Sequence, residues 1–349
     1  MTYLLQWIKK EKWVFILSLL AIALTAFPFV YRSVGTAPSE SNDAVFSEQS
    51  RLETSDQIQN LSKNILAHPE QYTTTILLTT VLFLIFILGI ILNILYGIKH
   101  RSMQNAMRIH DLEHVPWTGF DLYKFCLYLY LTQNIFSLLF SIVWQLWPDA
   151  VGLNWVLIGS TIVSWLFVTS ILTLYLKRKY GVSFFDLGLR LKKVIKQIGI
   201  GILYYIGIIP LYLAVILGMA KLLEHLQYQP PVQVPVQMLY SETDHGTLLW
   251  LALLMSFIAP FFEELFFRGF MYPVFRKKWG AFWGILVSSA LFALVHGHFV
   301  AFLPIFGLGL ALNWIYEKTG SIIPGFVMHV CHNSLMLLIT LHIKDLIHG

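Results

Sequence analysis

The chain has 349 residues, of which 57% are hydrophobic and only 12% are charged, and its mean hydropathy is +0.67. Because soluble domains carry about 25% charged residues, this composition excludes an ordinary soluble protein and indicates a polytopic membrane protein. The formal net charge of +5 does not indicate a nucleic-acid partner, since the basic residues lie in short loops beside apolar segments.

Apolar runs of about 18 to 25 residues are long enough to cross a bilayer as single helices. The chain holds about nine such runs, which predict an all-α fold, a polytopic transmembrane helical bundle. The number falls to about eight if the tight pair at 280–316 is partly re-entrant. The predicted spans are 13–31, 75–98, 123–146, 154–176, 197–220, 247–275, 280–298, 299–316 and 322–342.

Basic residues gather in alternate connections, most densely at 177–196 and again at 276–278. By the positive-inside rule, this pattern predicts a cytoplasmic N-terminus and an external C-terminus. Apolar residues are interleaved with the charges of 177–196, so we expect this segment to lie on an anionic inner leaflet. Compact inner loops favour an integral, multi-pass protein of a bacterial plasma membrane, surrounded by the lipid bilayer, with a eukaryotic endomembrane as the alternative.

Polar residues inside the predicted spans concentrate towards the C-terminal end of the chain. We therefore predict two parts, an accessory transmembrane region at 1–182 and a catalytic or transport core at 183–349. The accessory region includes a polar external loop at 32–74, in which apolar residues at helical spacing predict one amphipathic helix.

The stretch from Pro260 to Arg268 reads Pro-Phe-Phe-Glu-Glu-Leu-Phe-Phe-Arg within a predicted span. Each ionised side chain at mid-bilayer costs roughly 2.5 to 3.5 kcal/mol, so three of them in so short a run indicate a functional site. Glu264 and Arg268 are four residues apart and share a helix face, whereas Glu263 is turned about 100° away. One acid can therefore pair with the arginine while its neighbour stays free for chemistry.

Prolines predict bends in the same part of the chain. Pro260 lacks the amide hydrogen that would bond to the carbonyl of Ser256, and Pro304 and Pro324 interrupt later spans in the same way. Bent or broken helices would let polar groups from separate spans converge.

Two further polar groups follow on later spans. His296 lies near the end of the predicted span 280–298, one helical turn after Phe292. His329 and Asn333 are four residues apart near the start of the last span, so both can point to one locus. Asn333 in an apolar helix also requires hydrogen-bond partners.

These residues resemble the three motifs of the CPBP family of intramembrane proteases, which process CAAX proteins and bacteriocins and are also called Abi proteins. The similarity covers about residues 183–342 and implies an intramembrane endopeptidase that hydrolyses a peptide bond of a membrane-associated protein or peptide. The motifs are Glu263-Glu264-x-x-x-Arg268, Phe292-x-x-x-His296 and His329-x-x-x-Asn333.

The resemblance also implies roles for the side chains. Glu263 and His296 would hold and deprotonate a water molecule. His329 and Asn333 would donate hydrogen bonds to the oxyanion that forms when this water attacks the peptide carbonyl. The remaining pair, Glu264 with Arg268, would anchor the segment.

A metal-dependent mechanism is an alternative. Glu263, His296 and His329 would supply three ligands and leave one position for water, as catalytic zinc sites do. The sequence has no His-Glu-x-x-His motif and no Gly-x-Ser-Gly motif, so zinc proteases of that kind and rhomboid-type serine proteases are excluded. A metal-free glutamate mechanism and a divalent metal such as zinc both remain open at this stage.

Two non-proteolytic functions are alternatives to the protease hypothesis. The polar groups could form a hydrogen-bonded brace in a membrane scaffold or regulator with the same fold. A transporter would be expected to show repeated halves with matching broken helices, and the sequence has no such repeat. The scaffold reading predicts that Glu263→Gln leaves the phenotype intact.

Overall fold

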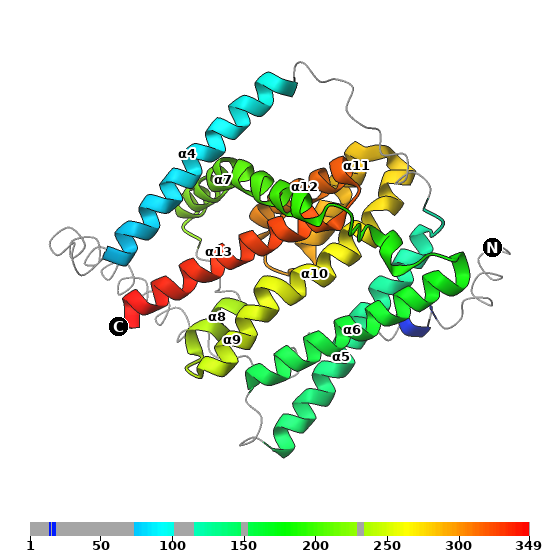
Figure 1. Ribbon diagram of the computed structural model, residues 1–349. Coiled ribbons are helices and arrows are strands. Elements are labelled where there is room, and N and C mark those ends of the chain that lie inside the picture. The colour runs from blue at the N-terminus through cyan, green and yellow to red at the C-terminus, as the bar shows by residue number, and fades with distance from the viewer. Residues whose placement is uncertain are drawn as a thin grey trace. The chain divides into compact units, whose positions relative to one another are not determined.

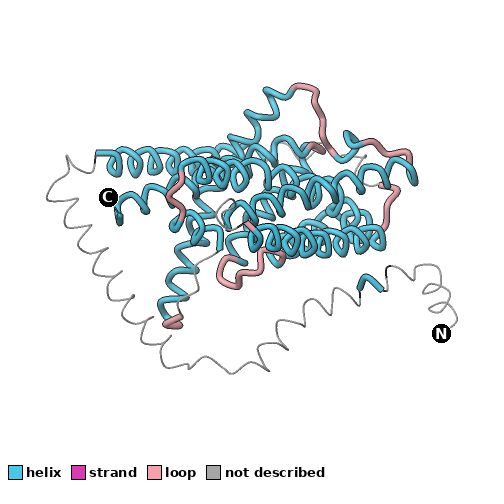
Figure 2. Tube along the Cα trace, turned by 90° about the horizontal axis from the view of Figure 1, so that it is seen from below, coloured by secondary structure: helices cyan, strands magenta, loops and turns pink. Residues whose placement is uncertain are grey.

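The computed structural model describes residues 14, 16–18, 73–100, 115–147, 153–228 and 234–348. All regular elements in these ranges are helical, and Figure 2 shows helices joined by loops, with no strand in the described ranges. The all-α prediction is therefore confirmed. Nearly all of the predicted span 13–31 and of the predicted external loop 32–74 lies outside the described residues.

Helices of about 25 to 30 residues, long enough to cross a bilayer, dominate the structure (Figure 1). Two π-helical segments, η4 and η5, interrupt one long helical stretch. The described elements are α4 (Thr73–His100), α5 (Gly119–Leu146), α6 (Leu153–Tyr180), the 3-10 turn η3 (Phe184–Leu187), α7 (Val194–His225), α8 (Val234–Ser241), α9 (His245–Leu253), η4 (Leu254–Ile258), α10 (Ala259–Glu263), η5 (Glu264–Met271), α11 (Tyr272–Leu294), α12 (Phe302–Thr319) and α13 (Ile322–His348).

Six helical stretches in the described ranges are long and apolar enough to cross a membrane. One of them, His245–Leu294, covers two predicted spans and is broken at Gly280, whose φ of 79° is left-handed. Helix α12 covers the predicted span 299–316 but is not among the six, because Glu317 and Lys318 make its last turn polar. The chain is therefore an integral, multi-pass membrane protein, as predicted.

The chain forms two compact units, residues 85–346 and residues 1–84 with 347–349. Most of the second unit lies outside the described residues. In the larger unit, the helix that carries the acidic stretch supplies much of the apolar core, with Phe266 and Phe270 buried beside Phe292 of α11. The indole nitrogen of Trp117 donates to the carbonyl oxygen of Phe270 at 2.9 Å and joins the segment before α5 to this core. The predicted division at residue 182 stays a prediction.

Helices α5 and α6 lie side by side (Figure 1) and are joined at one end by a buried carboxylate. Asp121, at the start of α5, accepts hydrogen bonds from Lys179 at 2.9 Å, from Tyr180 at 2.8 Å and from Tyr175. It also accepts from the backbone amide of Thr118 and so caps its own helix. Since a buried carboxylate is tolerated only when it is paired, this cluster fixes the register of α5 on α6.

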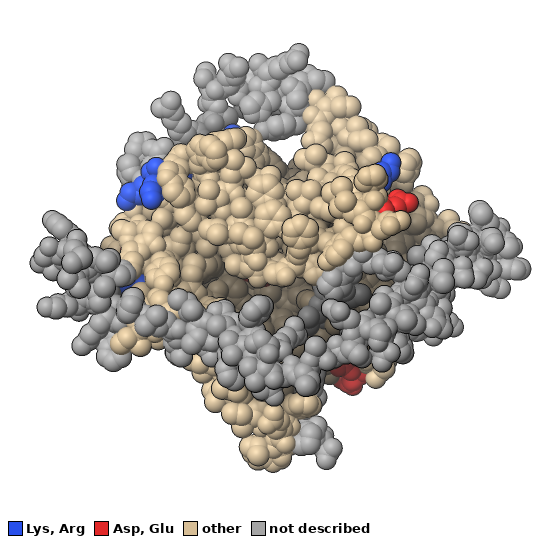
Figure 3. Space-filling view, turned by 180° about the vertical axis from the view of Figure 1, so that it is seen from behind, with Lys and Arg blue, Asp and Glu red and all other residues tan. Residues whose placement is uncertain are grey.

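Apolar side chains dominate the surface of the long helices. On α4, for example, Leu77, Phe83 and Leu84 are all exposed. Figure 3 shows one face of the molecule on which coloured Lys, Arg, Asp and Glu side chains are few and lie towards its edges. Such a face is suited to contact with lipid acyl chains and would be costly in water.

The turn η3 packs against η5 with no room for an added side chain. A Cβ atom on Gly269 would lie 2.4 Å from the carbonyl oxygen of Leu187. We expect Gly269→Ala to lower the free energy of unfolding by about 1 to 3 kcal/mol, as overpacking of a buried contact does. Chemical unfolding in detergent would measure it. The matched control is Gly207→Ala on α7, where an added Cβ meets nothing within 4 Å; equal effects at both positions would contradict the argument.

Candidate active site

The acidic stretch lies where one long helix changes its hydrogen-bond register. The π-helical turn η4 precedes α10, and η5, which is also π-helical, begins at Glu264 and includes Arg268. Pro260 stands near the start of α10, so the bend predicted there takes the form of a local change from α-helical to π-helical winding. Short π-helical segments inside α-helices are rare and often mark functional sites.

Glu264 and Arg268 form a buried ion pair, as their four-residue spacing predicted. Nη1 of Arg268 lies 2.9 Å from Oε1 of Glu264, and both side chains are 0% exposed. Gly325, in the first turn of α13, allows the carboxylate to approach: an added Cβ there would lie 2.9 Å from Oε2 of Glu264. The start of a helix carries a partial positive charge, so α13 further stabilises the Glu264 anion.

His329 lies between the two glutamates. Its Nδ1 atom is 3.0 Å from Oε1 of Glu264, and its Nε2 atom is 3.7 Å from Oε2 of Glu263. The first contact is a hydrogen bond, whereas the second is too long for a direct one. Glu263 is 18% exposed, in contrast to the fully buried Glu264. The two adjacent carboxylates therefore occupy different environments, one enclosed and charge-paired, the other open.

Phe292 connects the three motifs. The guanidinium carbon of Arg268 lies 4.4 Å from the centre of the Phe292 ring, a cation–π contact. The same ring makes edge contacts with His296 and His329, with centroid separations of 4.9 Å and 5.8 Å. Phe292 is itself buried. It therefore fixes the relative positions of the arginine and both histidines.

His296 follows α11 in a turn and is exposed. Its Nδ1 atom lies 2.7 Å from the carbonyl oxygen of Phe292. When Nδ1 carries the hydrogen, this bond holds the ring in place and leaves Nε2 available. His296 thus adjoins the pair of glutamates through Phe292, whereas His329 contacts them directly.

Asn333 contacts a different part of the same long helix. Its Nδ2 atom donates to the carbonyl oxygen of Met255, in η4, at 2.8 Å. The expectation that His329 and Asn333 point to one locus holds only in part, since His329 meets the glutamates and Asn333 meets the turn that precedes them.

Of the predicted metal ligands, Glu263 and His329 lie 3.7 Å apart, but no metal-binding group of three forms with His296 in the described structure. Within the described ranges, His, Cys, Asp and Glu side chains form no group of three that could hold a metal ion. The Nδ1 atom of His296 faces the backbone of its own helix. The donor arrangement does not fit a three-ligand zinc site, so we assign no catalytic step to a metal.

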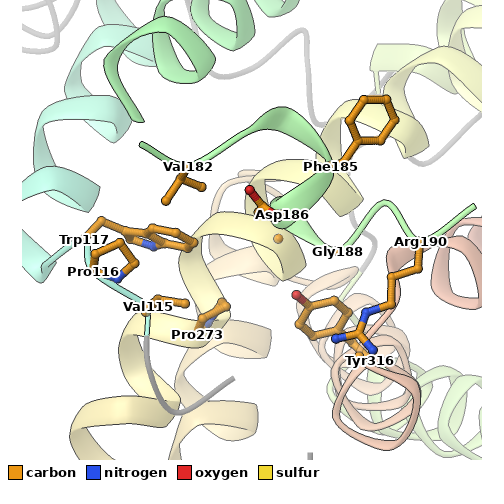
Figure 4. A pocket seen from close by; sticks show the side chains of 12 residues that line it. Val115, Pro116, Trp117, Val182, Phe185, Asp186, Gly188, Arg190, Pro273 and Tyr316 are labelled. Atoms are coloured by element: carbon orange, nitrogen blue, oxygen red, sulfur yellow. The ribbon is translucent and has the colours of Figure 1, made fainter. Parts of the chain in front are cut away.

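A cavity of about 340 Å³ lies between the segment before α5, the loop around η3 and the end of α12. Figure 4 shows Trp117, Asp186, Arg190 and Tyr316 around it. Gly269 also lines the cavity, but none of the six predicted site residues does. The cavity is therefore separate from the cluster of glutamates and histidines.

Sequence reasoning did not assign three features to the site. They are the ring of Phe292, the carbonyl of Met255 and the absence of a side chain at Gly325. Phe292 belongs to the second motif, and its four-residue spacing to His296 places both on one helix face, but the sequence did not predict the contacts of its ring with Arg268 and His329. The other two depend on contacts with distant segments and leave no local signal.

Part of the chain matches a known protein family. Residues 245–335 match the family described as type II CAAX prenyl endopeptidase Rce1-like. The matched segment contains all six predicted site residues, and it is shorter than the predicted similarity over 183–342. No curated protein and no solved structure matched the chain. Over residues 245–335, the chain therefore resembles the Rce1-like CAAX endopeptidases, in agreement with the resemblance of its three motifs to the CPBP family of intramembrane proteases.

Proposed function

We propose that this protein is an intramembrane endopeptidase that cleaves a membrane-associated protein or peptide with Glu263 as the general base. The observation that carries this proposal is the unequal exposure of two neighbouring carboxylates. Glu264 is 0% exposed and paired with Arg268, while Glu263 is 18% exposed and has no such partner in the described structure. In enzymes, two neighbouring titratable groups held in different environments commonly have different roles, one as the catalytic acid or base and the other as a supporting group.

The separation between Glu263 and His329 suits a water molecule bound to both. At 3.7 Å, Oε2 of Glu263 and Nε2 of His329 are too far apart for a direct hydrogen bond, yet one water can lie about 2.8 Å from each. Oε1 of Glu264 orients the histidine through Nδ1. The arrangement therefore presents a carboxylate base and an imidazole donor to the same reacting atoms.

The proposed hydrolysis passes one proton through Glu263. Glu263 takes one proton as the water oxygen attacks the carbonyl carbon of the substrate, and a tetrahedral oxyanion forms. His329 donates a hydrogen bond from Nε2 to this oxyanion, and removing one such donor typically costs about 10²- to 10³-fold in rate. When the carbon–nitrogen bond breaks, the leaving amine takes the proton from Glu263, which returns to its anionic form.

The remaining predicted residues support this centre. Arg268 balances the charge of Glu264 and keeps it from competing as a base. We propose that Nε2 of His296 helps to hold the water or the substrate carbonyl at the open end of the site, since Nδ1 is engaged with Phe292. Asn333 could reach the oxyanion only with the second hydrogen of its amide, because the first is directed to Met255.

The substrate is proposed to reach the site from the bilayer. The matching family is described by prenylated CAAX substrates, and a lipid-modified or membrane-spanning peptide would be held at the depth of the glutamates. We retain the sequence-based proposals of a cytoplasmic N-terminus and a bacterial plasma membrane.

The test compares cells carrying the intact protein with cells carrying Glu263→Gln at matched expression. We expect membrane-released peptides and new protein N-termini that occur only with the intact protein, and these fragments would identify the substrate and its cleavage side. Indistinguishable profiles from two equally folded and localised proteins would favour the scaffold or regulator.

A chelator distinguishes the two catalytic schemes. We expect 1,10-phenanthroline or EDTA to leave the cleavage rate of the purified protein unchanged, because the three predicted zinc ligands do not converge. The measurement is the rate in detergent or proteoliposomes, with metal content determined on the same sample. Stoichiometric zinc that is lost together with activity in His296→Ala would reverse this conclusion.

A further inference from the structure

The π-helical turn before Pro260 leaves one backbone carbonyl without its amide partner. In η4 the amide of Ala259 donates to the carbonyl oxygen of Leu254, five residues earlier. In that register the next amide, at residue 260, would donate to Met255. Residue 260 is proline, which has no amide hydrogen. The orphaned group is therefore the Met255 carbonyl rather than that of Ser256, which an unbroken α-helix would have predicted.

An unpaired backbone carbonyl is costly in this environment. A buried peptide group without a hydrogen bond destabilises the folded protein wherever water cannot reach the group. In the hydrocarbon region each such group costs several kcal/mol. A helix interrupted by proline in a membrane is tolerated when a side chain from a neighbouring helix satisfies the freed group.

Asn333 supplies that missing donor. Its Nδ2 atom lies 2.8 Å from the Met255 carbonyl oxygen, and the two residues are 78 positions apart in the chain. One helical turn earlier on α13, His329 binds Glu264. Helix α13 thus holds the long helix at two points, one before Pro260 and one after it. Glu263 and Glu264 follow Pro260 by about one helical turn. The orientation of both side chains therefore depends on how the π-helical turn η4 is closed.

We propose that Asn333 is a positioning residue that closes the π-helical turn left open by Pro260 and thereby sets the direction in which Glu263 and Glu264 project. This role acts through the Met255 carbonyl and requires no contact with substrate. It differs from direct donation to the oxyanion in one testable respect. If Asn333 is a positioning residue, a backbone amide restored at position 260 can take over its function. If Asn333 donates directly to the oxyanion, the restored amide has no effect on the loss of Asn333.

The experiment is a double-mutant cycle between positions 260 and 333. Asn333→Leu removes the donor with little change in volume, and Pro260→Ala restores an amide that can bond to Met255 in the π-helical register. If η4 relaxes to an α-helix in that variant, the amide of Ala259 reaches Met255 instead. In either case, Pro260→Ala supplies the hydrogen-bond donor to the Met255 carbonyl that Asn333→Leu removes.

The first measurement is the cleavage rate of each variant, and it rests on the proposed function. We expect Asn333→Leu alone to lower kcat by about 100-fold with little change in KM, since a displacement of about 1 Å can cost that much. In the Pro260→Ala background the same change should cost less than about threefold, because the two positions are coupled through one carbonyl. An equal loss in both backgrounds would assign Asn333 to the reacting oxygen and overturn the proposal.

The second measurement, the thermal unfolding midpoint, does not depend on activity. Asn333→Leu should lower the thermal unfolding midpoint in detergent, and Pro260→Ala should restore most of that loss. The matched control is Pro210→Ala, which changes another proline inside a helix and should restore nothing. Equal losses of midpoint with and without Pro260→Ala would overturn the proposal whatever the protease assay shows, so its failure can be distinguished from a failure of the proposed function.

Discussion

Replacing Glu263 by Gln is expected to lower kcat/KM for peptide cleavage by about 10²- to 10⁴-fold, the usual contribution of a general base. Glutamine keeps the size and hydrogen-bonding capacity of the side chain but cannot accept the proton from water. Glu263 is 18% exposed, and its Oε2 atom lies 3.7 Å from Nε2 of His329, too far for a direct hydrogen bond, so its neutralisation should disturb the fold little. The measurement is a single-turnover rate with a cleaved peptide in proteoliposomes, alongside the unfolding midpoint of each variant.

Two variants serve as controls for this loss. Glu263→Asp keeps the carboxylate but withdraws it from the site, so it should retain an intermediate rate. Glu224→Gln makes the same chemical change on an exposed acid near the end of α7 and should behave as the intact protein does. If Glu263→Gln stays fully active while Glu264→Gln folds normally and loses activity, the roles of the two acids are reversed.

Replacing Arg268 by Met is expected to lower the free energy of unfolding by about 3 to 5 kcal/mol, because one partner of a buried ion pair is removed and the other stays charged. Arg268 and Glu264 are both 0% exposed and 2.9 Å apart. The guanidinium also stacks on Phe292, so the change should loosen the contact that joins the three motifs. Unfolding in a denaturing detergent, with the intact protein as reference, measures the loss.

The double variant Glu264→Gln with Arg268→Met should recover part of this stability, since neither charge is then left unpaired. It should not recover activity, because a neutral side chain at 264 orients His329 less firmly. Arg178→Met, on an exposed arginine near the end of α6, is the matched control and should change stability by less than about 0.5 kcal/mol. A loss at Arg268 no larger than at Arg178 would show that the buried pair contributes nothing to folding.

Local sequence features predicted much of the architecture. Apolar runs located the described spans because the length of a membrane helix is set by the thickness of the bilayer. The four-residue spacing of Glu264 and Arg268 predicted their ion pair because neighbours at that spacing share one face of a helix. A bend was expected at Pro260, although its π-helical form was not. The bends expected at Pro304 and Pro324 were wrong, because these prolines lie in the first turns of α12 and α13, where proline is tolerated.

The sequence by itself thus determined the class of protein, the membrane-spanning helices and the six polar residues that the family match also encloses. Only the tertiary structure decided which glutamate is enclosed, because burial of Glu264 depends on His329 and Gly325, both from α13. It also decided that Asn333 meets the Met255 carbonyl. Hydropathy and helical spacing are properties of neighbouring residues, whereas these contacts join segments more than 60 positions apart, whose approach is set by the packing of whole helices.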